Sequence, residues 1–173
     1  MAGEIDFSTA LEQRLSILSL HLDDVQKITN KISSQITDSF KKNKELIQSL
    51  SNDIWIVSGG FDEVICPIVS EYGISDDHVI ANSFIYEGDM IIGCDKNNFL
   101  FQDKGKSQAI KSLNIADSII MIGDGYTDLE VFLDGEVDYF ICFTENIKRQ
   151  KVIKESTFVA SNFEEIMKIV NKI

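Results

Sequence analysis

The chain contains the stretch Met121-Ile122-Gly123-Asp124-Gly125-Tyr126-Thr127-Asp128, which follows an apolar run beginning at Ile119. The pattern predicts a buried strand that ends at a glycine-flanked aspartate, with a helix beginning after it. Asp128 is then expected in the first turn of that helix, on the same side as Asp124. Two carboxylates at the end of a parallel strand suit a hard cation such as Mg²⁺, which takes oxygen ligands. A plain acidic turn explains the same residues equally well, because Gly-Asp-Gly is common in loops.

The strand before Asp124 belongs to an alternation of strands and helices that begins at residue 54. Apolar runs alternate with helical patterns, the runs at 54–57, 119–122, 139–143 and 157–160 and the helices at 61–72, 106–113, 147–154 and 163–172. This order predicts an α/β fold with a parallel, Rossmann-like sheet. Two further runs, 79–86 and 90–93, flank Glu87-Gly88-Asp89 and are predicted to form a β-hairpin.

The N-terminal part has a different pattern. Its apolar residues recur at helical spacing and no strand-like alternation appears. Three helices are expected, the third beginning near Asp38 and carrying Phe40, Ile47 and Leu50 on one face. We therefore predict a small helical cap module over residues 1–52 and an α/β core over residues 53–173.

The composition excludes several classes of protein. A net charge of −12 argues against a partner that is nucleic acid or an anionic membrane. Cys66, Cys94 and Cys142 are odd in number and widely spaced, which is typical of reduced thiols rather than of a disulfide framework or a zinc site. No signal-peptide pattern is present, and no apolar run approaches the about 18–20 residues of a membrane span. We expect a cytoplasmic protein; its oligomeric state is left open by the sequence.

Two other groups of residues occur where parallel sheets place functional groups, at strand ends and helix starts. Ser58-Gly59-Gly60 follows a strand and offers a hydroxyl and backbone N–H groups to an anion, although a tight strand-to-helix turn is the simpler explanation. Lys104 precedes a glycine and a helix, and suits either phosphate binding or a solvated surface. Together with Asp124 and Asp128, these residues indicate a site for phosphate and Mg²⁺.

Three stretches resemble motifs of the haloacid dehalogenase-like superfamily. They are Ile56-Val57-Ser58-Gly59-Gly60-Phe61, Asp103-Lys104-Gly105-Lys106 and Ile122-Gly123-Asp124-Gly125-Tyr126-Thr127-Asp128, which are similar to its second, third and fourth motifs, and most similar to those of phosphoserine phosphatases. The opening residues Met1 to Phe7, with Arg14 beyond, are similar to the start of that family's helical cap. The resemblance covers essentially the whole chain and implies hydrolysis of a small phosphorylated metabolite, O-phosphoserine, with Mg²⁺ as cofactor.

The resemblance also implies a role for each residue of the core motifs. Ser58, with the backbone of Gly59 and Gly60, would bind the transferring phosphoryl group, and Lys104 would hold its oxygens. Asp124 would be a direct Mg²⁺ ligand, whereas Asp128 would support the metal's water shell and Lys104. Thr127 would lie near the phosphate.

In the cap, the resemblance implies that Arg14 pairs with the substrate carboxylate, a bidentate contact suited to a guanidinium. Met1 and Phe7 would line the pocket over the carbon skeleton of the substrate. Without the resemblance, Met1 and Phe7 are better explained as helix-packing residues, and Arg14 as a surface charge beside Glu12.

The sequence departs from the family in its first motif, an Asp-x-Asp-x-Thr/Ser after an apolar strand, which supplies the nucleophile and the general acid. No apolar strand precedes Asp6, Asp23 or Asp24. In the shared fold that strand lies between those ending at Ser58 and Gly123, so two open strand edges are expected. The chain is therefore interpreted either as an enzyme whose nucleophile segment comes from elsewhere, or as a catalytically inactive phosphate-binding or regulatory domain, such as one domain of a longer serine-biosynthesis protein.

Overall fold

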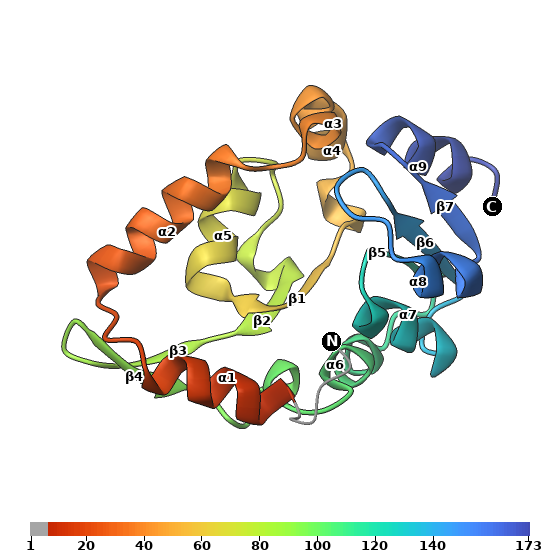
Figure 1. Cartoon of the computed structure of the whole chain (residues 1–173). Coiled ribbons are helices and arrows are strands. Elements are labelled where there is room, and N and C mark those ends of the chain that lie inside the picture. Colours follow the sequence, from red (N-terminus) through yellow and green to blue (C-terminus); the bar gives the residue numbers. More distant parts are fainter. Residues whose placement is uncertain (1–6) are drawn as a thin grey trace. The chain divides into compact units, whose positions relative to one another are not determined.

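The computed structural model describes residues 7–173, and the contacts within the chain group into two compact units. The first unit comprises Met1–Gln35 and Ile47–Gly105, and the second comprises Ile36–Leu46 and Lys106–Ile173. The path of the chain can be followed in Figure 1. The predicted division into a helical cap (residues 1–52) and an α/β core (residues 53–173) does not coincide with these two units, and it stays a prediction.

The N-terminal part of the chain is helical, as predicted. Its elements are α1 (Phe7–Ser16), α2 (Leu22–Ser34), α3 (Asp38–Lys42), α4 (Lys44–Ser49) and the 3-10 helix η1 (Ser51–Asp53). The predicted third helix is divided at Asn43, which is a correction. The N–H of Asn43 bonds the carbonyl of Phe40, while its side chain donates to the carbonyl of Ser39 and to Glu164, so the helix ends and a new one begins.

The first unit contains a two-stranded parallel sheet and a hairpin. The sheet pairs β1 (Ile56–Phe61) with β2 (Val79–Asn82), and α5 (Asp62–Ser70) connects them and packs along α2, as Figure 1 shows. The short 3-10 helix η2 (Asp76–His78) leads into β2. The hairpin pairs β3 (Phe84–Glu87) with β4 (Met90–Cys94), and the 3-10 helix η3 (Phe99–Phe101) follows it.

Two expectations for this unit need correction. The predicted hairpin is present, but residues 79–82 form a separate strand parallel to β1, because the polar pair Asn82-Ser83 interrupts the run. The predicted turn at Ser58-Gly59-Gly60 is instead part of β1. Val57 pairs with Ile80 and Phe61 with Asn82, so the four-residue step along β1 matches a two-residue step along β2. The two extra residues form a bulge in β1.

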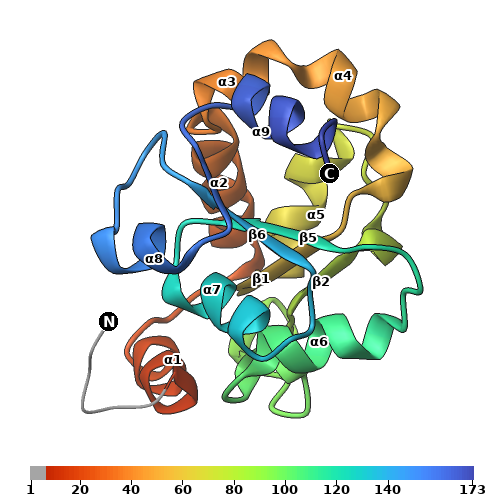
Figure 2. The same cartoon turned by 90° about the vertical axis from the view of Figure 1, so that its right-hand side faces the viewer.

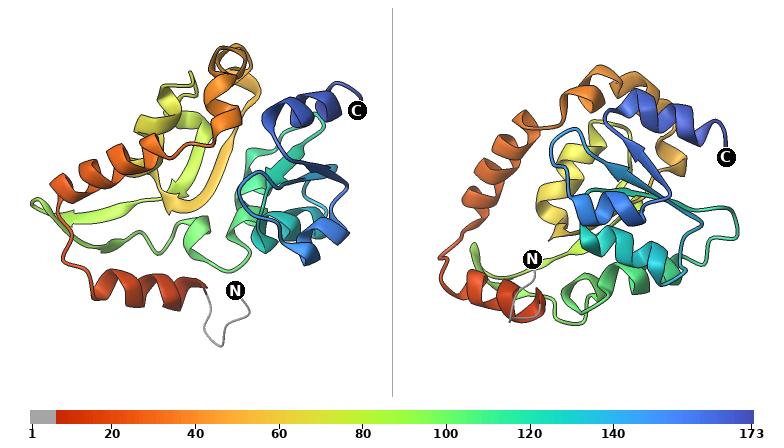
Figure 3. Two further views of the ribbon diagram at one scale, coloured as in Figure 1. Left: turned by 45° about the horizontal axis from the view of Figure 1, so that its top comes forward. Right: turned by 45° about the vertical axis from the view of Figure 1, so that its right-hand side comes forward.

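The second unit is built on a parallel sheet with the strand order β5-β6-β7. Its strands are β5 (Ile120–Gly123), β6 (Tyr139–Phe143) and β7 (Phe158–Ala160), and its helices are α6 (Gly105–Leu113), α7 (Tyr126–Leu133), α8 (Gln150–Glu155) and α9 (Phe163–Val170). The strands and helices of this unit can be followed in Figure 2 and in the two further views of the chain in Figure 3. Leu129 and Val131 of α7 and Phe140 of β6 are fully buried in its core. The predicted α/β class is confirmed.

In the part of the chain that the structure describes, β1 and β5 each lie at the edge of a sheet. β1 has only β2 as a strand partner, and β5 has only β6. Ile122, inside β5, is 41% exposed although its strand has an apolar composition. These are the two edges that the family resemblance implied. Within residues 7–173, no helix has the length and apolar character needed to cross a membrane.

Candidate active site

Asp124 lies at the carboxyl end of β5, and its side chain is 45% exposed. Arg149, at the start of α8, places its Nε 3.4 Å from Oδ2 of Asp124. Arg149 was not among the residues predicted from the sequence, where its signal is a basic residue at the beginning of the helix that follows β6. The pairing leaves Asp124 open to solvent, where it can meet a ligand.

Asp128, by contrast, is buried in the first turn of α7, as predicted. Its Oδ1 accepts from Nζ of Lys106 at 2.5 Å, and its Oδ2 accepts from the backbone N–H of Gly125 at 3.0 Å. Both carboxylate oxygens are therefore engaged by the protein. Asp128 holds the turn that presents Asp124, since Gly125 directly follows that residue.

Gly123 is required at the end of β5 because Asp128 approaches its backbone closely. A Cβ at this position would lie 2.3 Å from Cγ of Asp128, a distance that real Cβ atoms do not show. Any larger residue would push the buried carboxylate away from Lys106 and from the N–H of Gly125. The glycine before Asp124 is thus explained by packing in this turn.

The carboxylates at this end of the sheet act on the thiol of Cys142 in β6. Burial raises the pKa of the Cys142 thiol, and the charges of Asp124 and Asp128 raise the pKa further. Cys142 is the residue of β6 that pairs with Gly123, so it senses the field at the strand ends. The half-exposed Asp124 carboxylate attracts cations, and the cation that it meets in this structure is Arg149.

The donor chemistry fits Mg²⁺ with Asp124 as the protein ligand. Mg²⁺ commonly keeps several waters and binds through one or two carboxylates together with phosphate oxygens. Within the described residues, no group of three or more histidine, cysteine or acidic side chains could hold a metal ion. A single exposed carboxylate, supported by a second that is already hydrogen-bonded, is compatible with a largely hydrated magnesium ion.

In the first unit, the Ser58-Gly59-Gly60 bulge folds back on itself. Oγ of Ser58 accepts a hydrogen bond from the N–H of Gly60 at 3.0 Å, and the carbonyl of Gly59 accepts one from the side chain of Asn82 at 3.0 Å. The N–H of Gly60 is therefore engaged inside the bulge. Asn82 was not identified from the sequence, because its partner is 23 residues away.

Lys104 also belongs to the first unit, where it is exposed and has a φ of 56°. This left-handed conformation is uncommon outside glycine and asparagine. The next residue, Gly105, packs closely against the backbone of Phe99. A Cβ at Gly105 would lie 2.0 Å from the carbonyl oxygen of Phe99. The described partner of Asp128 is Lys106, and the expected support of Lys104 by Asp128 stays a prediction.

The remaining predicted residues lie as follows. Arg14 is exposed on α1 in the first unit, and Thr127 is exposed in the first turn of α7 in the second. Met1 and the side chain of Phe7 lie outside the described residues. Ser58 and Lys104 belong to one unit and Asp124 to the other, and their gathering into one site stays a prediction.

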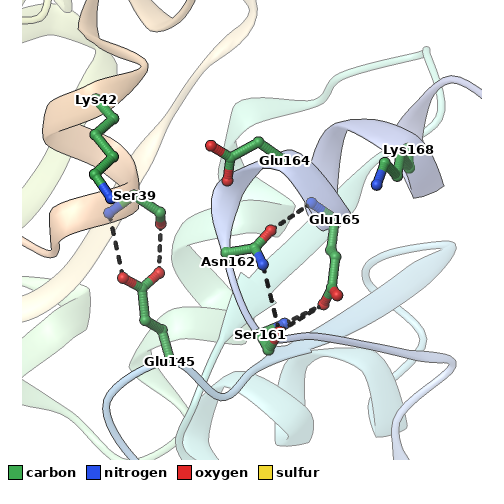
Figure 4. A pocket seen from close by; sticks show the side chains of 8 residues that line it. All are labelled: Ser39, Lys42, Glu145, Ser161, Asn162, Glu164, Glu165 and Lys168. Atoms are coloured by element: carbon green, nitrogen blue, oxygen red, sulfur yellow. Dashed lines mark hydrogen bonds between the residues drawn. The ribbon is translucent and has the colours of Figure 1, made fainter.

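A polar pocket of about 480 Å³ lies in the second unit, and Figure 4 shows the side chains that line it. Its lining residues are Ser39, Lys42, Glu145, Ser161, Asn162, Glu164, Glu165 and Lys168. Glu145 accepts from the N–H and the hydroxyl of Ser39, and Glu165 accepts from Ser161. These contacts hold α3 against the segments that carry Glu145 and Ser161.

An apolar pocket of about 380 Å³ lies in the first unit between α2, α5 and β1. It is lined by Leu20, Val25, Ile28, Ile32, Ser58, Gly60, Phe61, Val64, Ile65, Ile68 and Phe84. Ser58 contributes the one polar side chain of this lining. The hydroxyl proposed to meet a phosphoryl group therefore borders an apolar cavity.

Comparison with known proteins gives the chain its family. Residues 32–132, more than half of the chain, match the family described as haloacid dehalogenase-like hydrolase. The chain belongs to the haloacid dehalogenase-like hydrolase family. The predicted superfamily and fold class are both confirmed.

Relatives of this haloacid dehalogenase-like chain carry the name phosphoserine phosphatase. The protein of Drosophila melanogaster is 31% identical over 175 residues, which cover 96% of this chain and 63% of the relative. The Arabidopsis thaliana protein, named "Phosphoserine phosphatase, chloroplastic", is 28% identical over 171 residues, covering 96% of this chain and 58% of the relative. The chain thus spans less than two thirds of the length of these two relatives.

A solved structure shares the fold of this haloacid dehalogenase-like chain. It is a phosphoserine phosphohydrolase-like protein from Francisella tularensis subsp. tularensis SCHU S4, with a TM-score of 0.81 and 33% sequence identity. The match covers 97% of this chain and 79% of that one.

Proposed function

We propose that the chain forms the phosphate- and Mg²⁺-binding part of a phosphomonoester hydrolase of the phosphoserine phosphatase type, with O-phosphoserine as its substrate. The observation that carries the proposal is Asp124, a half-exposed carboxylate at the end of a parallel strand, presented by a turn that Asp128 holds. The names of the relatives support the choice of substrate.

In this proposal each of the three motifs contributes part of the chemistry. The hydroxyl of Ser58 and the N–H of Gly59 bind the phosphoryl group, with the Gly60 N–H holding the Ser58 side chain in place. Lys104 neutralises phosphoryl charge, and Thr127 lies near the phosphate. Asp124 holds Mg²⁺, which supplies charge stabilisation at the phosphoryl oxygens when bound.

The amino-acid end of the substrate is assigned to the N-terminal helices. Arg14 pairs with the substrate carboxylate, and Met1 and Phe7 line the pocket above the carbon skeleton. The guanidinium of Arg149, 3.4 Å from Asp124, is a further cation that suits an anionic substrate.

Hydrolysis by the family's route needs a carboxylate nucleophile and a general acid. An Asp-x-Asp after an apolar strand, which supplies both, does not occur in this sequence. We therefore propose that a separate Asp-x-Asp segment supplies those groups. The same observation favours a second candidate, a catalytically inactive domain that binds phosphate and acts in regulation or within a longer serine-biosynthesis protein.

Cytoplasmic location and a small-molecule partner complete the proposal. Burial raises the pKa of Cys66 to about 11 and raises the pKa of Cys94 as well, so these thiols stay protonated at neutral pH. The net charge of −12 argues against nucleic acid as a partner.

The decisive experiment measures Mg²⁺-dependent phosphate release from O-phosphoserine, with the chain alone and with an added Asp-x-Asp segment. We expect turnover only with the segment, and its loss in Asp124→Asn, because an amide is a weak ligand for Mg²⁺. Binding of Mg²⁺ measured by calorimetry should be lost in the same variant. Asp117→Asn, a change at another exposed aspartate, is the matched control and should retain both properties.

Turnover that persists in Asp124→Asn would remove this residue from the metal site and refute the proposal. Turnover by the chain alone would show that the nucleophile lies within these 173 residues. If the chain binds inorganic phosphate and no form hydrolyses the ester, the regulatory candidate is the correct one.

A further inference from the structure

We infer that Asn82 is a positioning residue for the proposed site, and that its single side-chain amide holds the Ser58-Gly59-Gly60 bulge and the segment leading to Lys104 on the same strand end. The inference rests on the proposed function, since it concerns residues assigned there to phosphate binding. All of the contacts involved lie within the first unit.

The burial of Asn82 demands an explanation. Asn82 is the last residue of β2 and has no exposed surface. A primary amide in an apolar interior is unfavourable unless its polar atoms are hydrogen-bonded. The side chain is therefore kept at this position by what it bonds.

The first bond repairs the bulge in β1. The register shift between Val57 and Phe61 takes residues of β1 out of the parallel ladder, so their backbone groups need other partners. Nδ2 of Asn82 donates to the carbonyl of Gly59 at 3.0 Å. The amide thus replaces a strand hydrogen bond and holds the bulge one residue after Ser58.

The second contact reaches the segment that precedes Lys104. The same Nδ2 lies 3.4 Å from the carbonyl oxygen of Leu100 in η3. Asn98 secures this segment from its other end, because its Nδ2 donates to the carbonyl of Ala81 at 2.7 Å and its Oδ1 accepts from the N–H of Leu100. The two asparagines therefore hold η3 on the end of β2, four residues before Lys104.

The orientation of the Asn82 amide follows from these partners. Both partners are carbonyl oxygens, which accept hydrogen bonds and do not donate them, so the NH₂ group must face them. Oδ1 then points elsewhere, and it is buried without a hydrogen-bond partner among the described residues. An acceptor left unsatisfied in this way indicates that the two donated contacts outweigh its cost.

The test uses two substitutions at Asn82 in the full chain. Asn82→Leu removes the amide with little change in size, and Asn82→Asp keeps the shape while removing both donors. We expect inorganic phosphate to bind about fivefold more weakly or worse in both, the effect of losing roughly one hydrogen bond. Thr144→Val is the matched control, because it also removes a buried side-chain donor to a backbone carbonyl, in the second unit.

The Asp variant provides a readout that a purely structural role would not produce. Below the pKa of the introduced carboxyl group its O–H can donate to the carbonyl of Gly59, whereas above that pKa its charge repels both carbonyl oxygens. The phosphate affinity of Asn82→Asp relative to the native chain should therefore recover as the pH is lowered. The ratio for Asn82→Leu should stay constant with pH.

Amide hydrogen exchange tests the inference without any ligand. The N–H of Gly60 bonds Ser58 Oγ and the N–H of Gly105 bonds the carbonyl of Gln102, so the two report on the bulge and on the Lys104 segment. Exchange of both amides, Gly60 and Gly105, should accelerate in the Asn82 variants. Neither amide should exchange faster in Thr144→Val. Acceleration at only one of them, or unchanged phosphate affinity in folded variants, would overturn the inference.

These readouts separate the inference from the proposed function. If the native chain fails to bind phosphate, the proposed function fails, and the exchange data alone decide the role of Asn82. If Asn82→Leu does not fold, Asn82→Asp at low pH supplies the decision, because its protonated carboxyl group restores one donor.

Discussion

Glu63 illustrates how a single buried carboxyl group can couple the stability of this chain to pH. Its Oε1 accepts from the N–H of Phe84 at 2.8 Å, while its Oε2 is buried with no hydrogen-bond partner among the described residues. Burial, with a smaller contribution from the neighbouring Asp62, raises the pKa of Glu63 from 4.5 to about 7. The hydroxyl of Tyr86 is also buried without a hydrogen-bond partner among the described residues. Burial raises the pKa of Tyr86, and the charge of Glu63 contributes to this shift.

The sign of the pH effect follows from this raised pKa. Between pH 4.5 and about 7 the folded chain binds more protons than the unfolded chain, so stability falls as the pH rises through this range. Glu63→Gln removes the ionisation and keeps the shape. We expect the variant to gain about 1–2 kcal/mol in free energy of unfolding over the native chain at pH 8, after allowance for solvent screening, and little at pH 5.

Urea unfolding at pH 5, 6, 7 and 8 measures this difference. Glu155→Gln, at an exposed position, is the control and should show no trend. A difference between Glu63→Gln and the native chain that does not change with pH would rule out ionisation of Glu63 as the cause.

At the scale of elements, α3 shows how a helix too short to persist alone is held in place. A five-residue helix is far below the length at which isolated helices are stable in water. The ring of Phe40 packs edge-on against Phe143 and Phe163, with centroids 5.4 Å and 5.2 Å away. Glu145 accepts from both the N–H and the hydroxyl of Ser39, as Figure 4 shows.

We therefore expect Glu145→Ala to lower the free energy of unfolding by about 1–3 kcal/mol, since hydrogen bonds to a charged acceptor are lost and Ser39 is buried. Glu145→Gln keeps one acceptor and should lose less. Urea unfolding of the full chain gives both values, with Glu155→Ala as the control. Ordinary surface substitutions change the free energy of unfolding by up to about 0.5 kcal/mol. If Glu145→Ala changes it by no more than that, α3 is held by its aromatic contacts alone.

At the scale of the whole molecule, the chain divides its contacts between two units and passes between them at residues 35–36, 46–47 and 105–106. Regions with separate contact sets commonly open in separate steps. We expect Glu145→Ala to accelerate amide hydrogen exchange in β6 and β7 and to leave exchange in β1 and β2 unchanged. Equal acceleration in both sheets would mean that the chain opens as one cooperative body.

Much of the second unit could be predicted from the sequence. The limits of β6 were predicted correctly, and the predicted strand before Asp124 differs from β5 by one residue at each end, because apolar runs bounded by glycine and aspartate have few local alternatives. The placement of Asp124 at a strand end and Asp128 in the next helix followed from the same local pattern.

The features that the sequence analysis missed depend on distant partners. Residues 79–82 were assigned to a hairpin, because alternation does not reveal whether a strand pairs with its neighbour or with an earlier strand. The bulge in β1 depends on Asn82, the partner of Asp128 is Lys106, and Arg149 meets Asp124 from 25 residues away. Each of these contacts joins residues that no local period relates.

The sequence by itself determined the order of the elements, the family and the acidic strand end at Asp124, because periodicity and turn chemistry act over a few neighbouring residues. Tertiary structure decided which of those groups are available to a ligand. Asp124 stays open whereas Asp128 is engaged on both oxygens, and Asn82 and Ser39 are buried by partners 23 and 106 residues away. Burial and hydrogen bonding are settled by whatever segment packs against a residue, and the chain brings those segments together only when it folds.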